Sequence, residues 1–104
     1  MIIEHRTYKI KPGKVNVLME LYEKEGMKVH KEILGNQIGF FYTEIGPLNE
    51  IVHIYGYESL DDRAIRRKKL AENKTWQEYI KKGMKLIEHQ ESKILLPANF
   101  SEIK

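Results

Sequence analysis

The spacing of apolar residues changes after the first ten positions. Residues 2–10 alternate apolar and polar side chains and are rich in β-formers, which predicts a strand that ends where Pro12 fixes its own backbone. From residue 12 to 34 the apolar residues recur at spacings of three, four and seven, which is typical of one helix face. These residues are Val15, Leu18, Leu21, Tyr22, Val29 and Ile33. Gly35 then suits the position just beyond a helix end, where a left-handed backbone is needed.

The centre of the chain predicts a β-hairpin. Residues 37–46 and residues 50–58 are both rich in aromatic and β-branched side chains. Between them, Gly46–Asn49 has the composition of a turn. Two strands joined by a short turn form a hairpin, so we expect these strands to pair.

A second helical region follows the hairpin and is divided in two. Ser59 suits the N-cap of a first helix, because acidic residues fill the turn that follows it. Asn73 interrupts the helical pattern, and Thr75-x-x-Glu78 has the spacing of a capping box. We therefore expect two helices that meet near residues 73–75.

Residues 91–96, which Pro97 ends, predict the last strand, so the order of elements is β-α-β-β-α-β. That order is typical of the ferredoxin-like fold of the α+β class. It predicts one four-stranded antiparallel sheet with the helices on one face. A chain of 104 residues fits a single domain over residues 1–104.

Alternation along the third strand divides its side chains between two faces. One face carries Ile51, His53, Tyr55 and Tyr57, and the other carries Val52, Ile54 and Gly56. Small and aliphatic side chains suit close packing against helices, so we expect the histidine–tyrosine set on the open face. A large aromatic surface left in water marks an interface. We therefore expect a homodimer in which an identical chain covers this open sheet face, so that the two sheets close into a barrel around a cavity.

Composition and charge narrow the chemistry. The chain has no cysteine, which excludes disulfides and thiolate nucleophiles. The net charge is +3, and the one dense basic cluster is Arg66–Lys69 with Arg63 one turn earlier. Acidic residues flank this cluster and no aromatic lies within it, which favours a solvated helix face over an anion-facing role and predicts no nucleic-acid partner. No apolar stretch is long enough to span a membrane, and the charged start is not typical of a signal peptide.

Five segments resemble those of a known family. They are Arg6–Tyr8, Lys11–Lys14, Gly39–Tyr55, Trp76-x-x-Tyr79 and Ile94–Ser101. Together they resemble the NIPSNAP family, within the dimeric α/β-barrel superfamily, over nearly the whole chain. The resemblance implies a fold and a homodimer more than a reaction and, for a chain of this size, a cytoplasmic location. The wider superfamily contains monooxygenases, haem-degrading enzymes and isomerases, which use a cavity between sheet and helices or inside the barrel.

His53 is the best single candidate for chemistry, because imidazole titrates near neutrality and can move protons. The alternative is a core histidine bonded to a neighbour. Arg6 and Glu44 are expected to pair on the inner face, with Glu4 as a further partner, because an unpaired buried charge is costly. That arginine is either part of a structural ion pair or a site for an anion.

Parity places Tyr8 and Tyr42 in the same inner space, where they either orient a planar ligand or fill the barrel. The histidines lack metal-ligand spacing, so no metal site and no cofactor are expected. His30 lies among lysines and is expected to be exposed. Trp76 is expected to be a core anchor rather than a ligand platform.

Two functions follow from these residues. The first is a homodimeric module that binds a small ligand in the cavity or a partner on its outer surface, at Gly46–Asn49 or the basic helix Arg63–Lys69. The second is a small-molecule enzyme, monooxygenase-like or isomerase-like, that uses the barrel cavity around His53. The site residues expected in the cavity are Arg6, Tyr8, Tyr42, Glu44, His53 and Tyr55.

Overall fold

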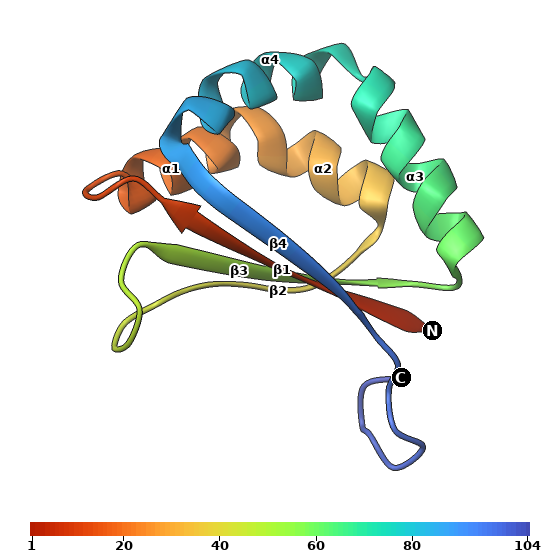
Figure 1. Cartoon of the computed structure of the whole chain (residues 1–104). Helices are drawn as coiled ribbons and strands as arrows, with labels where there is room; N and C mark the ends of the chain where they lie inside the picture. The colour runs from red at the N-terminus through yellow and green to blue at the C-terminus, as the bar shows by residue number, and fades with distance from the viewer.

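The computed structural model describes all 104 residues, as a four-stranded antiparallel sheet with helices on one face (Figure 1). The strands lie in the order β2-β3-β1-β4. Their bounds are Ile2–Ile10 for β1, Asn36–Tyr42 for β2, Glu50–Tyr57 for β3 and Ile87–Leu95 for β4. This topology is ferredoxin-like, so the predicted fold class is confirmed.

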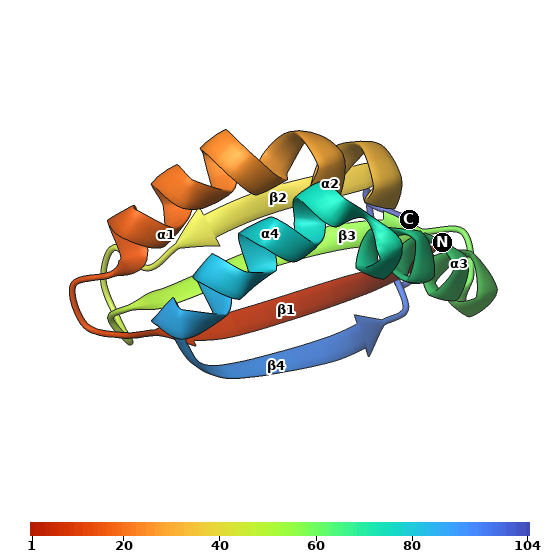
Figure 2. The same ribbon diagram turned by 90° about the horizontal axis from the view of Figure 1, so that it is seen from above.

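The helices form a single layer above the sheet (Figure 2). The first rod consists of α1 (Val15–Leu21), a π-helical segment (Tyr22–Gly26) and α2 (Met27–Leu34). The second region consists of α3 (Leu60–Glu72), α4 (Lys74–Gly83) and a 3₁₀ turn (Met84–Leu86). Seen from above, these helices lie mainly over β2 and β3, β1 runs along the edge of the helix layer, and no helix lies over the edge strand β4. The helix layer and the strands β1, β2 and β3 enclose the interior.

The predicted helix boundaries are partly confirmed. The Ser59 hydroxyl accepts a hydrogen bond from a backbone N–H of the first turn of α3, at 3.1 Å, as expected of an N-cap. Thr75 does not cap α4. The side-chain oxygen of Asn73 accepts the bond from the backbone N–H of Trp76 at 3.0 Å, and the helix begins at Lys74. Asparagine is the stronger N-cap, and its extended backbone suits the position.

Two strand boundaries differ from those predicted. The second strand ends at Tyr42, because the chain then turns through Gly46 and Asn49, which both adopt positive φ angles. The last strand begins at Ile87 rather than near residue 91, because β4 pairs along almost the whole length of β1. The first half of this edge strand is polar, so its sequence carries little strand signal.

The predicted assignment of the two sheet faces is wrong. Ile51, His53, Tyr55 and Tyr57 are 5% exposed or less and pack beneath the helices. The open face instead carries Val52 and Ile54 on β3 together with aliphatic side chains of the other strands. Within this set, the Tyr55 hydroxyl meets Nδ1 of His30 on α2 and the amide of Gln37 on β2, whereas Nδ1 of His53 and the Tyr57 hydroxyl have no hydrogen-bond partner.

The first helical rod faces the sheet through residues spaced four apart. Its buried residues are Leu18, Tyr22, Gly26, His30 and Leu34. In an α-helix, residues four apart advance about 40° around the axis at each step, so this series would leave the sheet. The wider π turn rotates less per residue and keeps the series on one face. His30, expected to be exposed, is 3% exposed for this reason.

Gly26 lies against α4, where it faces the ring of Tyr79. A Cβ atom built on this residue would stand 3.0 Å from Cγ and Cδ2 of Tyr79 in α4. Gly83, in α4 itself, faces the same tyrosine with more room, since its Cβ would meet Tyr79 Cζ at 3.4 Å and Leu18 Cδ1 at 3.5 Å. The helix contact therefore depends on the missing side chain at Gly26 and not on that at Gly83.

We predict opposite effects for alanine at these two glycines. Gly26→Ala should lower the free energy of unfolding by about 1 kcal/mol, because the Tyr79 ring must move out of a packed interior. Gly83→Ala should raise it by up to about 1 kcal/mol, because it improves helix propensity at a position with helical φ and ψ and ordinary contacts. Urea unfolding of both variants checks this. A gain in stability for Gly26→Ala would contradict the close packing.

Candidate functional site

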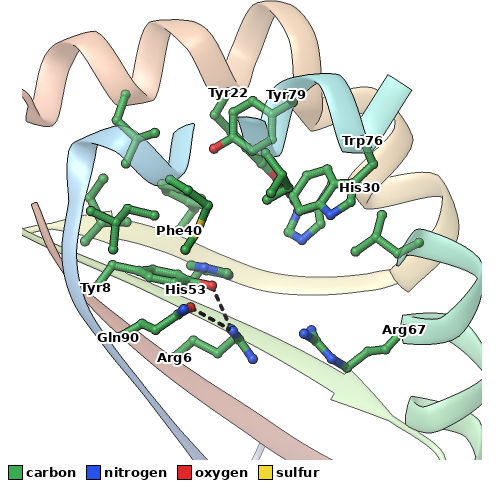
Figure 3. A pocket seen from close by; sticks show the side chains of 16 residues that line it. Arg6, Tyr8, Tyr22, His30, Phe40, His53, Arg67, Trp76, Tyr79 and Gln90 are labelled. Atoms are coloured by element: carbon green, nitrogen blue, oxygen red, sulfur yellow. Dashed lines mark hydrogen bonds between the residues drawn. The ribbon is translucent and has the colours of Figure 1, made fainter. Parts of the chain in front are cut away.

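A pocket of about 170 Å³ lies between the helix layer and the covered face of the sheet (Figure 3). Most of its lining is apolar, and five aromatic side chains surround it: Tyr8, Tyr22, Phe40, Trp76 and Tyr79. Met84 and Gln90 are exposed and lie at its rim. An apolar cavity of about 150 Å³ holds a benzene molecule, so this pocket has room for a ligand built on one ring.

The floor of the pocket is a row of stacked rings across three strands. The His53 ring on β3 lies between Tyr8 on β1, at a centroid distance of 4.8 Å, and Phe40 on β2, at 5.2 Å. Above them, the ring of His30 stacks on Trp76 at 4.4 Å with an angle of 3° between the planes. The flat faces of these rings fix one another, which makes the lining rigid.

A buried hydrogen-bond network holds the back of the pocket. Nδ1 of His30 lies 2.8 Å from the hydroxyl groups of both Tyr22 and Tyr55. The amide of Gln37 donates to the same two hydroxyls, at 3.1 and 2.7 Å. This network joins the first helical rod to β2 and β3. Burial raises the pKa of both tyrosines, so both hydroxyls stay protonated.

Both buried histidines are uncharged at neutral pH. Burial is the main cause that lowers the pKa of His30 to about 3, and the positive charges of Arg67 and Arg6 act in the same direction. Burial also lowers the pKa of His53 to about 3, with His30 and Arg6 as further causes. A neutral imidazole with so low a pKa is a weak base at neutral pH, which is unsuited to general-base catalysis.

A fully buried carboxylate, Glu4, organises the charged side of the site. Arg63 of α3 donates to it through Nε and Nη2, at 3.0 and 2.8 Å, and Arg6 donates through Nη1 at 2.9 Å. The Ser92 hydroxyl of β4 donates at 2.6 Å. Burial alone would raise the pKa of Glu4, but the hydrogen bonds from Arg63 and Ser92 and the charge of Arg6 outweigh it and lower the pKa to about 2. Glu4 is therefore ionised and joins β1, β4 and α3.

Two guanidinium groups line the pocket. Arg6 donates through Nε to the Tyr8 hydroxyl at 2.8 Å and lies 3.5 Å from the Gln90 side-chain oxygen. Arg67, on α3, has neither an ion pair nor a hydrogen bond. Figure 3 shows the ends of Arg6 and Arg67 pointing toward one another across the side of the pocket opposite Tyr22 and Tyr79. The pocket therefore has an aromatic side and a positively charged side.

The structure brings together only part of the predicted site. Arg6, Tyr8 and His53 line the pocket, and Tyr55 stands directly behind it in the His30 network. Tyr42 is 56% exposed at the end of β2 and does not line the pocket.

Glu44 is exposed in the loop after β2, so the predicted Arg6–Glu44 pair is wrong. Arg6 pairs with Glu4 instead, because the two side chains project from the same face of β1, two residues apart.

Sequence reasoning missed three residues of the site: His30, Trp76 as a pocket wall, and Arg67. The sequence does contain a pattern that predicts burial of His30, because His30 continues the series of residues four apart that begins with Leu18 and Tyr22. The basic cluster is not one solvated face. Arg63 binds Glu4, Arg67 lines the pocket, and only the lysines point fully into solvent.

No group of three or more histidine and acidic side chains is placed to hold a metal ion. No helix of the structure is both long and apolar enough to cross a bilayer.

The NIPSNAP family model matches residues 3–102. The chain belongs to the NIPSNAP family. Among curated NIPSNAP relatives, a NipSnap homologue of Dictyostelium discoideum is 37% identical over 90% of this chain, and human NipSnap homolog 3A is 36% identical over 88%. The chain spans only about two-fifths of the length of these relatives, 41% and 37% respectively.

Solved NIPSNAP structures share the whole fold. A NIPSNAP family protein from Agrobacterium tumefaciens is 48% identical and superposes with a TM-score of 0.97, over 99% of this chain and 98% of its own. A second protein from that organism, of unknown function, is 44% identical with the same TM-score, over 100% and 94%. A putative antibiotic biosynthesis monooxygenase from Nitrosomonas europaea reaches 0.69 at 12% identity, over 93% and 98%, and so shares the fold alone.

We predict that the buried histidines make this NIPSNAP domain less stable in mild acid. Their pKa values are about 3 in the folded chain and about 6.5 when unfolded, so the unfolded state binds more protons between these values. The free energy of unfolding should fall as the pH drops below about 6.5, by about 1 kcal/mol per pH unit for each histidine. Glu4 has a pKa of about 2 in the folded chain and 4.5 when unfolded, so it adds to the loss of stability only below about pH 5.

Urea unfolding between about pH 7 and pH 5 measures this slope. His53→Gln should halve it, and His89→Gln, at an exposed position, should leave it unchanged. A wild-type stability that is constant across this range would show that the two imidazoles are not buried in the neutral form.

Proposed function

We propose that this NIPSNAP domain binds one small, mainly apolar molecule in the pocket between its helices and its sheet. The observation that carries the proposal is a pocket of about 170 Å³ whose aromatic walls are fixed before any ligand arrives. A preformed apolar pocket with a few polar groups is typical of small-molecule sites. Arg6, Tyr8 and His53 contact the ligand in this proposal, and Tyr55 holds His30 in place.

Binding is favoured over catalysis by the state of the histidines. His53 is the only residue that sequence analysis offered as a catalytic base, and it is buried and neutral with its ring held between Tyr8 and Phe40. Its Nδ1 atom has no hydrogen-bond partner. A buried imidazole with a pKa of about 3 shapes the pocket floor, but it is a poor acceptor of a proton from a substrate at neutral pH.

We predict that a neutral one-ring probe, benzyl alcohol, binds in this pocket with a dissociation constant on the order of 1 mM. Ile80→Trp fills the pocket from α4 and should weaken binding by at least about tenfold. Ile65→Trp is the matched control, because Ile65 is 60% exposed on α3 and does not line the pocket. NMR titration of the amide signals measures both affinity and location.

Thermal unfolding verifies that both tryptophan variants are folded. Equal affinity for wild type and Ile80→Trp would reject the pocket as the site, as would shifts confined to the open sheet face.

We also propose that the open sheet face joins two copies of the chain as a homodimer. This face carries a groove of about 270 Å³ with mostly aliphatic walls: Ile3, Ile38, Ile54, Leu95, Leu96 and Ile103. Leu95 and Leu96 are 42% and 79% exposed. The apolar surface of the open face thus comes from aliphatic residues rather than from the histidine–tyrosine set. A two-fold dimer pairs this face with itself and removes it from water.

Light scattering tests the dimer. We predict a mass of twice that of one chain for wild type and of one chain for Leu95→Glu, because a carboxylate in the centre of an apolar interface is left without a partner. Leu60→Glu is the matched control, since Leu60 is 59% exposed at the start of α3, away from the open face. A wild-type chain that is monomeric at high concentration would refute the dimer.

An outer-surface interaction module has less support. The basic helix uses Arg63 and Arg66 for contacts within the chain, to Glu4 and Asp62 respectively. The Gly46–Asn49 loop is largely exposed but shows no cluster of one chemical kind. The cytoplasmic location stays a prediction, which cell fractionation can test.

A further inference from the structure

We infer that the ligand of this pocket is a small carboxylate, with an apolar body about the size of one aromatic ring, and that Arg67 is the residue that binds its anionic group. This inference rests on the proposed binding function and names the class of ligand. It follows from the charge of the pocket, which the fold leaves unbalanced.

The unbalanced charge arises from the way Glu4 is shared. Arg6, Arg63 and Arg67 converge on this region, and Glu4 is the only carboxylate that pairs with any of them. Arg63 donates two hydrogen bonds to the Glu4 carboxylate, and Arg6 donates one. Two positive charges in this cluster therefore lack a counter-ion within the chain.

Arg67 is placed at the pocket by the same ion pair. Arg63 and Arg67 are one turn apart on α3 and lie on one face of the helix. When Glu4 fixes Arg63 against β1, Arg67 is directed to the pocket beside it. Its side chain is half-buried, and no acceptor, carboxylate or aromatic face contacts it. A guanidinium group with five donors is rarely left unused in such a place.

The two arginines form a receptor for an anion. Arg6 and Arg67 point toward one another, and like charges facing each other are relieved when an anion lies between them. A guanidinium group matches the two oxygens of a carboxylate with paired N–H donors. The amide of Gln90, at the rim, offers further donors.

The opposite wall defines the rest of the ligand. Tyr22, Trp76 and Tyr79 form an apolar side that suits a flat or compact hydrocarbon body. The available volume limits this body to about one ring, because a cavity of about 150 Å³ is filled by benzene. A ligand with its carboxylate at Arg67 and its ring at Trp76 uses both sides of the pocket.

Binding of two probes of equal size tests the inference. Benzoate carries the carboxylate, and benzyl alcohol does not. We expect wild type to bind benzoate at least about tenfold more tightly, because the anion gains charge-assisted hydrogen bonds. Arg67→Gln should remove this preference and leave the affinity for benzyl alcohol within about twofold of wild type. Arg67→Lys keeps the charge without the paired donors and should retain part of the preference.

Lys68→Gln is the matched control. It removes the same charge from the next residue of α3, which is exposed and does not line the pocket, so it should leave the preference unchanged. Arg67→Gln breaks no hydrogen bond or ion pair and should fold, which thermal unfolding verifies.

Each outcome is decisive. If benzyl alcohol binds and benzoate binds no better, or if Arg67→Gln weakens both probes equally, the carboxylate inference is overturned while the pocket function stands. If Lys68→Gln removes the preference as well, net charge and not Arg67 explains it, and the assignment of Arg67 fails. If neither probe binds, the pocket function fails together with the inference.

Discussion

The burial of one carboxylate constrains much of this molecule. Glu4 is fully buried on the covered face of the sheet, where an unpaired charge would cost several kcal/mol. It persists because Arg6, Arg63 and Ser92 surround it with hydrogen bonds from β1, α3 and β4. That requirement fixes α3 against the strands. Since Arg67 follows Arg63 by one turn, the contact that neutralises Glu4 also directs a second, unneutralised cation to the pocket.

The sheet reverses the usual division between its two faces. Its polar aromatic side chains lie under the helices, where His30 and Gln37 satisfy the hydroxyl groups of Tyr22 and Tyr55. Its aliphatic side chains lie on the face that no helix covers. An aromatic interior with a few polar groups leaves a pocket with defined hydrogen-bonding groups, whereas an aliphatic outer face suits association by simple burial of apolar surface. The two proposed activities therefore use opposite faces of one sheet.

The fold of this chain is found both in NIPSNAP proteins and in a protein of very different sequence. The monooxygenase-like neighbour has the same architecture at 12% identity, so the architecture alone says little about the ligand. NIPSNAP structures at 44% to 48% identity share both the architecture and the length of the chain. The curated relatives are more than twice as long, and the domain described here corresponds to part of each.

The sequence by itself determined the order of elements, the ferredoxin-like topology and the family, because periodicity, caps and turn residues act over a few neighbouring positions. It also placed Arg6, Tyr8 and His53 on one face of the strands by parity. Only the tertiary structure decided which face the helices cover, since that choice depends on partners such as His30 that are distant along the chain. The tertiary structure also decided that Glu4 rather than Glu44 pairs with Arg6. It likewise decided that Arg67, alone among the residues of the basic cluster, lines the pocket, because local sequence does not show which residue of the cluster faces the interior.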